Sequence, residues 1–365
     1  MWMEPDHMLI PDKRSLRSAV NDVSRSAKIV NLVYVNDKQP GITRVRKGDT
    51  FIYTDDKKKI QDPEILERIQ KLAIPPAWEN VWICKLANGH LQATGTDTLN
   101  RKQYKYHNRW SAVRNHTKFY RLIDFGKQLP GIRATIQKHL SLPGYPREKV
   151  LAIVVSLLEQ TNIRIGNSAY EKLYGSFGLT TLKNKHVDVN GIQMNFSFKG
   201  KKGIHHRISL RSKKLAKLVQ GCKDIPGKEL FQYIDENGIV QNVDSGMVNE
   251  YIQEISGGEF TAKDFRTWTG SVQALIAFNE AGPFENNTEM KQKIAAVLDV
   301  VASHLGNTRA VCKKYYVHPE VVKLYEENNL EKIIAAASSN AAENTAGLAP
   351  EEKLLLKILA LKKRT

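Results

Sequence analysis

Cysteine is scarce in this chain of 365 residues, and its three cysteines, Cys84, Cys222 and Cys312, are far apart. No Cys-x-x-Cys pair occurs, so we expect neither a disulfide framework nor a structural zinc site. The sequence also lacks an apolar run of the ~20 residues that a membrane-spanning helix needs, and its N-terminus lacks the basic and apolar regions of a signal peptide. These absences predict a cytoplasmic protein that acts without a membrane partner.

Motifs for nucleotide-dependent and metal-dependent chemistry are missing as well. The chain has no Gly-x-x-x-x-Gly-Lys-[Ser/Thr] loop, which argues against an ATP-driven motor. It has no Asp-x-Asp or His-Glu-x-x-His cluster that would hold a catalytic metal. We therefore expect no cofactor and no metal site.

Positive charge is what the sequence has in excess. The 55 Lys and Arg residues outnumber the 38 Asp and Glu residues, which gives a formal net charge of +17. A surplus of this size favours a polyanionic partner, and nucleic acid is the first candidate. The hydrophobic share of 41% and the charged share of 25% are ordinary for a globular protein.

The first third of the chain has strand-like patterning. Residues 1–27 are polar and predict an arm with one short helix. Residues 28–110 contain β-branched runs, of which 29–35 is the first, and one helical segment over 62–72. The pair Asn88-Gly89 between two apolar runs predicts a hairpin with a type I′ turn.

Helical periods dominate the rest of the chain. An amphipathic helix is expected over 149–160, and alternating residues over 186–210 predict a three-stranded meander with one buried face. Thr261 and Asp264 have the spacing of a capping box. Composition predicts a linker over 335–350, followed by a closing helix.

Together these patterns predict an α+β fold. A strand-rich domain would occupy residues 28–110. A mainly α-helical domain with a small three-stranded sheet would occupy 111–334. The arm 1–27 precedes them, and a linker with a C-terminal helix follows at 335–365.

A DNA enzyme without a metal needs cations at the phosphate oxygens, an acid for the leaving oxygen and a protein nucleophile. Arg suits the first task because its fork binds two oxygens and stays charged. Lys suits the second because its pKa falls in a positive site. Tyr suits the third because it forms a phosphodiester link.

Residues of these types occur in suggestive contexts: Arg164 follows the helix 149–160, Lys201 lies in the tight turn of the meander, Arg266 lies one turn inside a helix, and Tyr315 and Tyr316 precede a proline. Each also has an ordinary structural interpretation, as a solvated arginine, an exposed turn lysine or a half-buried tyrosine. Their spacing alone does not identify a site.

Three longer segments resemble the type IB DNA topoisomerases of the poxvirus-like and bacterial group. They run over residues 164–186, 261–268 and 306–319, in the order of that family. A fourth, over 95–106, is similar to the DNA-contacting stretch of the family. The resemblance extends from about residue 28 to about residue 330. It implies that residues 28–110 form a DNA-clamping domain and that residues 111–334 form a catalytic domain with the fold shared with the tyrosine recombinases.

The resemblance also implies a role for each matching residue. Arg164 and Arg266 match the two catalytic arginines, Lys201 matches the hairpin lysine that serves as general acid, and Tyr316 matches the nucleophile. Asn307 stands where poxvirus-like members have His, and its amide can still donate a neutral hydrogen bond to a phosphate oxygen.

The DNA contacts implied for the first domain come from one short stretch: Arg101, Lys102, Gln103, Tyr104 and Tyr106. From its residues alone, the preferred interpretation of that stretch is a strand on which Tyr104 and Tyr106 alternate, with one face packed on a core. The implied reaction is relaxation of supercoiled duplex DNA through a 3′-phosphotyrosyl intermediate, strand rotation and religation, without ATP or a required metal. The implied partner is double-stranded DNA, bound by a monomer that is nucleoid-associated if the protein is bacterial.

The chain departs from the family pattern in two places. Arg309 stands where Pro is common, and Tyr315 stands where Ser is common, so two adjacent tyrosines compete for the nucleophile's role. The hairpin likewise offers Lys199 and Lys202 beside the preferred lysine.

Two other functions remain possible at this stage. A tyrosine site-specific recombinase shares the same chemistry, but recombinases usually have His where this chain has Lys263. A non-catalytic architectural DNA-binding protein would account for the charge equally well.

Overall fold

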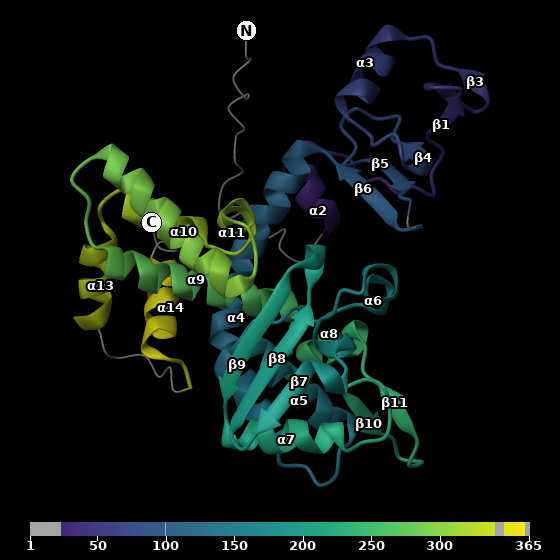
Figure 1. The fold of residues 1–365 in the computed structure, drawn as a ribbon. Helices are drawn as coiled ribbons and strands as arrows, with labels where there is room; N and C mark the ends of the chain where they lie inside the picture. The colour runs from purple at the N-terminus through teal and green to yellow at the C-terminus, as the bar shows by residue number, and fades with distance from the viewer. Residues whose placement is uncertain (1–22, 99, 340–346, 362–365) are drawn as a thin grey trace. The chain divides into compact units, whose positions relative to one another are not determined.

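The computed structural model describes residues 23–98, 100–339 and 347–361, and the chain divides into two compact units, Met1–Arg121 and Leu122–Thr365 (Figure 1). The long helix α4 (Asn108–His139) runs from the first unit into the second. The domain boundary near residue 110 stays a prediction. Of the arm, only α2 (Val23–Lys28) lies within the described residues.

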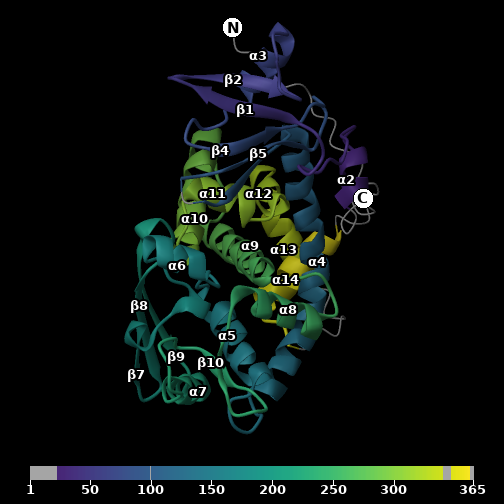
Figure 2. The ribbon, with the colours of Figure 1, turned by 90° about the vertical axis from the view of Figure 1, so that its right-hand side faces the viewer.

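The first unit is built on an antiparallel sheet, as predicted for a strand-rich region (Figure 2). Its six strands are arranged in the order β3-β2-β1-β4-β5-β6. They are β1 (Ile42–Lys47), β2 (Thr50–Asp55), β3 (Lys58–Lys59), β4 (Glu79–Ile83), β5 (Leu91–Thr96) and β6 (Lys102–Tyr106). Helix α3 (Pro63–Lys71) begins where Asp62 accepts hydrogen bonds from two backbone amides, and its Ile69 packs into the core of the sheet.

Two predictions for this unit are wrong. Residues 29–35 are not a strand, because Val30 and Leu32 pack against Trp110 and only Val33 makes an isolated bridge, to Gly89. The β4–β5 hairpin is confirmed, but its connection spans residues 84–90 and is not a two-residue type I′ turn. The amide of Gln92 donates to three carbonyls of this loop and holds it in its longer form.

The second unit combines helices with the predicted meander. Strands β7 (Val187–Asn190), β8 (Gln193–Lys199) and β9 (His205–Arg211) form an antiparallel sheet in that order. The helices that follow α4 are α5 (Arg147–Thr161), α6 (Ser168–Tyr174), α7 (Lys213–Lys223), α8 (Ser245–Ser256), α9 (Ala262–Ala281), α10 (Asn287–Leu305), α11 (Arg309–Tyr315), α12 (Pro319–Glu326), α13 (Leu330–Ser339) and α14 (Pro350–Leu361). A short hairpin of β10 (Gln232–Ile234) and β11 (Val240–Asn242) lies outside the sheet.

Helix α5 forms the centre of the second unit. Every residue from Val150 to Leu158 is buried, so the helix is not amphipathic as expected. It is enclosed because α7, α8 and α9 all pack against it. The capping box that opens α9 is confirmed, since the carboxylate of Asp264 accepts from the amide and hydroxyl groups of Thr261.

Details at the edges of this unit also differ from expectation. On the meander, Met194, Phe196 and Phe198 are buried as predicted, but Ile192 is exposed because it lies in the β7–β8 turn. The predicted linker is wrong for residues 335–339, which continue α13, and its residues 340–346 lie outside the described ranges.

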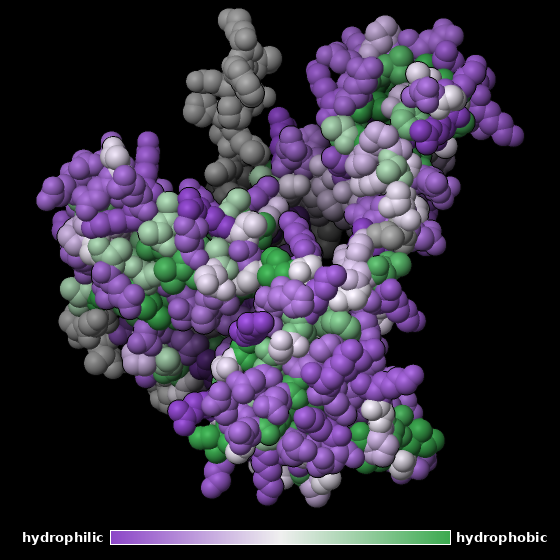
Figure 3. Space-filling view, in the orientation of Figure 1, coloured by the Kyte–Doolittle hydropathy of each residue, from purple (hydrophilic) through white to green (hydrophobic). Residues whose placement is uncertain are grey.

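The C-terminal helix α14 packs on α9. Figure 3 shows hydrophilic residues over most of the drawn face of each unit, interrupted by small apolar clusters. Within the described ranges, no helix is both long and apolar enough to span a membrane.

Candidate active site

The five predicted catalytic residues come from five separate segments of the second unit. Arg164 follows α5, Lys201 lies in the η3 turn (Lys201–Gly203) between β8 and β9, Arg266 lies in the second turn of α9, Asn307 follows α10, and Tyr316 follows α11. All except Arg266 line one cavity of about 340 Å³. The guanidinium carbon of Arg266 lies 5.2 Å from the centroid of the Tyr316 ring.

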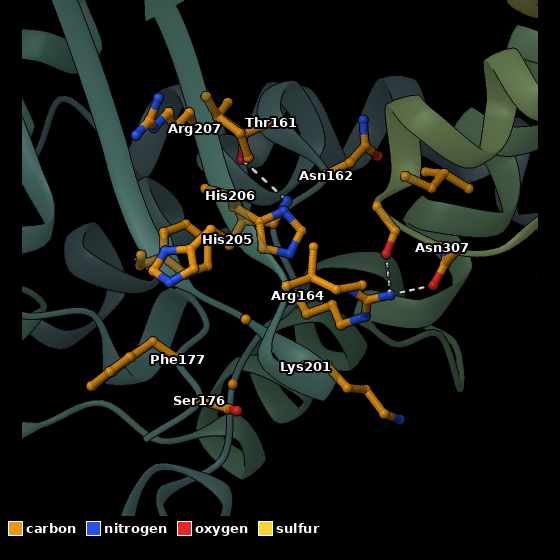
Figure 4. A pocket seen from close by; sticks show the side chains of 18 of the residues that line it. Thr161, Asn162, Arg164, Ser176, Phe177, Lys201, His205, His206, Arg207 and Asn307 are labelled. Carbon is orange, nitrogen blue, oxygen red and sulfur yellow. Dashed lines mark hydrogen bonds between the residues drawn. The ribbon is translucent and has the colours of Figure 1, made fainter. Parts of the chain in front are cut away.

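The backbone after α5 turns sharply to present Arg164. Asn162 ends the helix in the left-handed conformation, with φ of 54°, as a C-cap does. The carbonyl of Arg164 then accepts a hydrogen bond of 2.8 Å from the amide of Leu179. Gly178 is required here, because a Cβ at that position would lie 2.5 Å from this carbonyl oxygen. The side chain is thereby directed toward the loop after α10 (Figure 4).

Two guanidinium groups join the ends of α5 and α10. Nη2 of Arg164 donates to the carbonyl of Gly306, at 2.9 Å, and to Oδ1 of Asn307 (Figure 4). Arg266 is only 4% exposed, and it donates to the carbonyl of Asn162 and, at 2.7 Å, to the carbonyl of Leu305. The two arginines thus hold the backbone at the end of α5 next to the backbone at the end of α10.

Burial lowers the pKa of both arginines, and the charge of Arg266 lowers the pKa of Arg164 further. Both groups nevertheless stay charged, because the guanidinium does not deprotonate in proteins. Two positive charges held close together in a buried site favour an anionic ligand.

Two hydrogen-bond donors in this site are left without an acceptor. The Nδ2 atom of Asn307 and the Nε atom of Arg266 are buried and have no hydrogen-bond partner among the described residues. Each buried unpaired donor costs about 1–3 kcal/mol. The non-bridging oxygens of a phosphate would supply the missing acceptors.

Tyr316 is held at its backbone by α9. Its carbonyl accepts a hydrogen bond of 3.3 Å from the hydroxyl of Ser271, which also accepts from the amide of His318. Gly270 allows this close approach, since a Cβ there would lie 2.7 Å from the Tyr316 carbonyl oxygen. Tyr315 also lines the cavity, but the cation beside its ring is Lys314, with Nζ 5.4 Å from the centroid.

Two of the three hairpin lysines line the cavity that contains Tyr316. Lys201 and Lys202 both line the cavity, and Lys202 has a left-handed backbone with φ of 63°. Lys199 ends β8 and does not line this cavity. Lys263, one turn before Arg266 on α9, also lines it.

Four of the five predicted DNA-contacting residues lie on β6, at the edge of the first unit's sheet, and Arg101 directly precedes that strand. Lys102, Tyr104 and Tyr106 alternate along its exposed face, and the two tyrosine rings stack with centroids 6.0 Å apart. The alternative in which these tyrosines pack on a core is wrong, since they are 47% and 44% exposed. Arg101 and Gln103 both bind the carboxylate of Asp97 instead of joining this face.

Sequence reasoning missed the residues that support the site from behind. Asn162 supplies a carbonyl to Arg266, Ser271 holds the Tyr316 backbone, and His206 on β9 packs between the hairpin and the loop after α10. No motif marks them in a single sequence. Asn162, Ser271 and His206 each contact a residue that lies more than 40 positions away along the chain.

Two family models and several viral relatives match this chain. Residues 104–342 match the family model of the eukaryotic DNA topoisomerase I catalytic core, and residues 50–97 match that of the bacterial DNA topoisomerase IB N-terminal domain. The DNA topoisomerase 1B of Acanthamoeba polyphaga mimivirus is 35% identical over 297 residues, which cover 79% of this chain and 88% of the relative. The DNA topoisomerase 1B of Vaccinia virus (strain Copenhagen) is 22% identical over 282 residues, covering 75% and 86%.

Proposed function

The chain belongs to the type IB DNA topoisomerases, and we propose how its own residues carry out the reaction of that family. As a type IB enzyme it changes the topology of duplex DNA through a transient break in one strand. The proposal concerns the residues that bind, cut and reseal the strand.

In the proposed reaction, the phenolic oxygen of Tyr316 attacks a backbone phosphorus. The new Tyr–phosphorus bond forms as the bond to the 5′ oxygen breaks, and the tyrosine's proton passes to solvent. Lys201 gives a proton to the departing 5′ oxygen, which leaves as a hydroxyl. The cut strand rotates, and the 5′ hydroxyl then attacks the phosphotyrosine, reversing each bond change.

Charge on the non-bridging oxygens is stabilised by Arg164, Arg266 and Asn307. The observation that carries this proposal is the pair of buried donors without acceptors, Asn307 Nδ2 and Arg266 Nε, in a site that includes Tyr316. Donors that are fixed before substrate binds need no reorganisation as charge develops. This is the arrangement that phosphoryl transfer without a metal requires.

Binding to DNA is proposed to involve both units. The exposed face of Tyr104 and Tyr106 offers flat rings and hydroxyls to a phosphate backbone. Lys102 lies beside them and is paired with Asp37 at 2.5 Å, so it adds a cation once a phosphate displaces that carboxylate. All five proposed catalytic residues come from one chain, which supports a monomer as the active form. Affinity should fall steeply with salt, because the +17 charge acts through counterion release.

The test is relaxation of a supercoiled plasmid in EDTA without ATP, comparing wild type with Tyr316→Phe and Tyr315→Phe. We expect relaxation by wild type and Tyr315→Phe and none by Tyr316→Phe. Tyr315→Phe is the matched control, since it removes a hydroxyl from the same cavity. Loss with Tyr315→Phe alone would transfer the nucleophile's role to the neighbouring residue.

A further inference from the structure

His206, the second residue of β9, fills a gap between two backbones of the active site. Its ring stacks on Phe198, with centroids 5.2 Å apart and planes at 21°. On one side lies Gly200, where an added Cβ would be 2.5 Å from Cδ2 of the imidazole. On the other lies Gly306, where an added Cβ would be 2.6 Å from Cε1. The ring therefore touches both glycine backbones and leaves no room for a side chain at either.

The two glycines precede residues with different proposed roles in the reaction. Gly200 immediately precedes Lys201, the proposed general acid. Gly306 immediately precedes Asn307, and its carbonyl accepts the hydrogen bond from Arg164. The imidazole thus sets the separation between the acid on the hairpin and the donors that hold the phosphate.

We infer that His206 is a positioning residue, a spacer that keeps Lys201 in reach of the leaving oxygen while Arg164 and Asn307 hold the phosphate. The inference rests on the proposed function of Lys201. The hairpin needs such a support because the lysine itself is exposed and sits in a short turn. A displacement of about 1 Å at a reacting group costs on the order of 100-fold in rate.

The ring acts through its shape. Burial lowers the pKa of His206, and the charges of Arg164, Arg266 and His205 lower it further, which favours the uncharged ring. No hydrogen bond from this ring is recorded among the described residues, which leaves packing on Phe198, Gly200 and Gly306 as its visible function.

The experiment separates loss of acid catalysis from general damage. Single-turnover cleavage is measured on two DNA duplexes. Their scissile strands, here called the oxygen strand and the sulfur strand, differ only in the 5′ bridging atom of the scissile phosphate. A thiolate leaves without being protonated, so the sulfur strand does not need the acid. We expect His206→Ala to cleave the oxygen strand about 10- to 100-fold more slowly than wild type and the sulfur strand within about threefold of wild type.

Two reference variants fix the interpretation. Lys201→Ala should show the same selective loss, to a greater degree. His186→Ala removes a second imidazole of the same unit, a buried one that packs on Phe177 and accepts from the amide of Lys183. It should change both strands by the same factor. If sulfur does not rescue Lys201→Ala, the proposed acid is wrong and the spacer inference falls with it. If sulfur rescues Lys201→Ala but not His206→Ala, the acid stands and the spacer inference alone is wrong.

A second variant tests the spacer through its contact. Gly200→Ala alone should slow cleavage of the oxygen strand, because the new Cβ displaces the imidazole. In the His206→Ala background the same change should cost nothing further, since the space is then empty. Equal slowing of both strands by His206→Ala, or additive effects of the two substitutions, would overturn the inference.

Discussion

Replacing Asn307 by Asp separates the stability of the active site from its chemistry. In the free protein, Oδ1 of Asn307 accepts from Arg164, while the buried Nδ2 has no partner among the described residues. Aspartate keeps the acceptor and adds a charge opposite Arg164. It also replaces the unpaired Nδ2 donor with a carboxylate oxygen, which shares the negative charge that faces Arg164. We therefore expect the free energy of unfolding of Asn307→Asp to stay within about 1 kcal/mol of wild type or to rise.

Catalysis should respond in the opposite direction. Loss of one preorganised donor costs about 100- to 1,000-fold in rate, and a carboxylate also repels the phosphate. Single-turnover cleavage by Asn307→Asp should therefore fall by at least that factor, and by more than in Asn307→Ala. DNA affinity should change only modestly, because binding is spread over many phosphates. Cleavage within tenfold of wild type, or a protein that is clearly less stable, would refute this reasoning.

Three further outcomes are expected. Burial raises the pKa of Glu352, but hydrogen bonds from Arg133 and two other donors bring it below its ordinary value of 4.5. The carboxylate of Glu352 thus stabilises the folded state above pH 4.5, and this stabilisation is lost as the pH falls through the lowered pKa of Glu352 in the folded protein. Glu352→Gln should cost about 3 kcal/mol at pH 7, and the difference from wild type should shrink toward pH 3 in denaturant titrations. Arg266→Lys should lower both the melting temperature and the cleavage rate, because one ammonium cannot replace a fork bound to two carbonyls. Simultaneous alanine replacement of Tyr104 and Tyr106 should weaken DNA binding at fixed salt, measured by fluorescence anisotropy, and leave the cleavage rate at saturating enzyme within a few-fold of wild type.

Local sequence signals predicted the elements that depend on local chemistry. The capping box at Thr261 and the alternation over Met194 to Phe198 both report interactions within one element, and the structure confirms them. The prediction of a strand over 29–35 was wrong because the structure of that segment depends on residues far away in the sequence. Its β-branched residues are used for packing against Trp110, and composition cannot distinguish that from a place in a sheet.

The candidate site could be predicted only through the family resemblance. Its residues come from five segments and meet because Arg164 and Arg266 bind carbonyls in other loops. Such contacts leave no periodicity in the sequence. The contact of His206 with Gly200 and Gly306 is of the same kind, since a glycine near a histidine is an ordinary combination until the fold brings them together.

The most direct test of the account is to identify the residue that becomes joined to DNA. The protein is trapped on a nicked DNA strand whose cleaved end diffuses away, in EDTA, and the covalent adduct is digested and sequenced by mass spectrometry. The account predicts a single nucleotide-modified tyrosine at Tyr316, joined to a 3′ phosphate. Modification of Tyr315, or linkage to a 5′ phosphate, would contradict it.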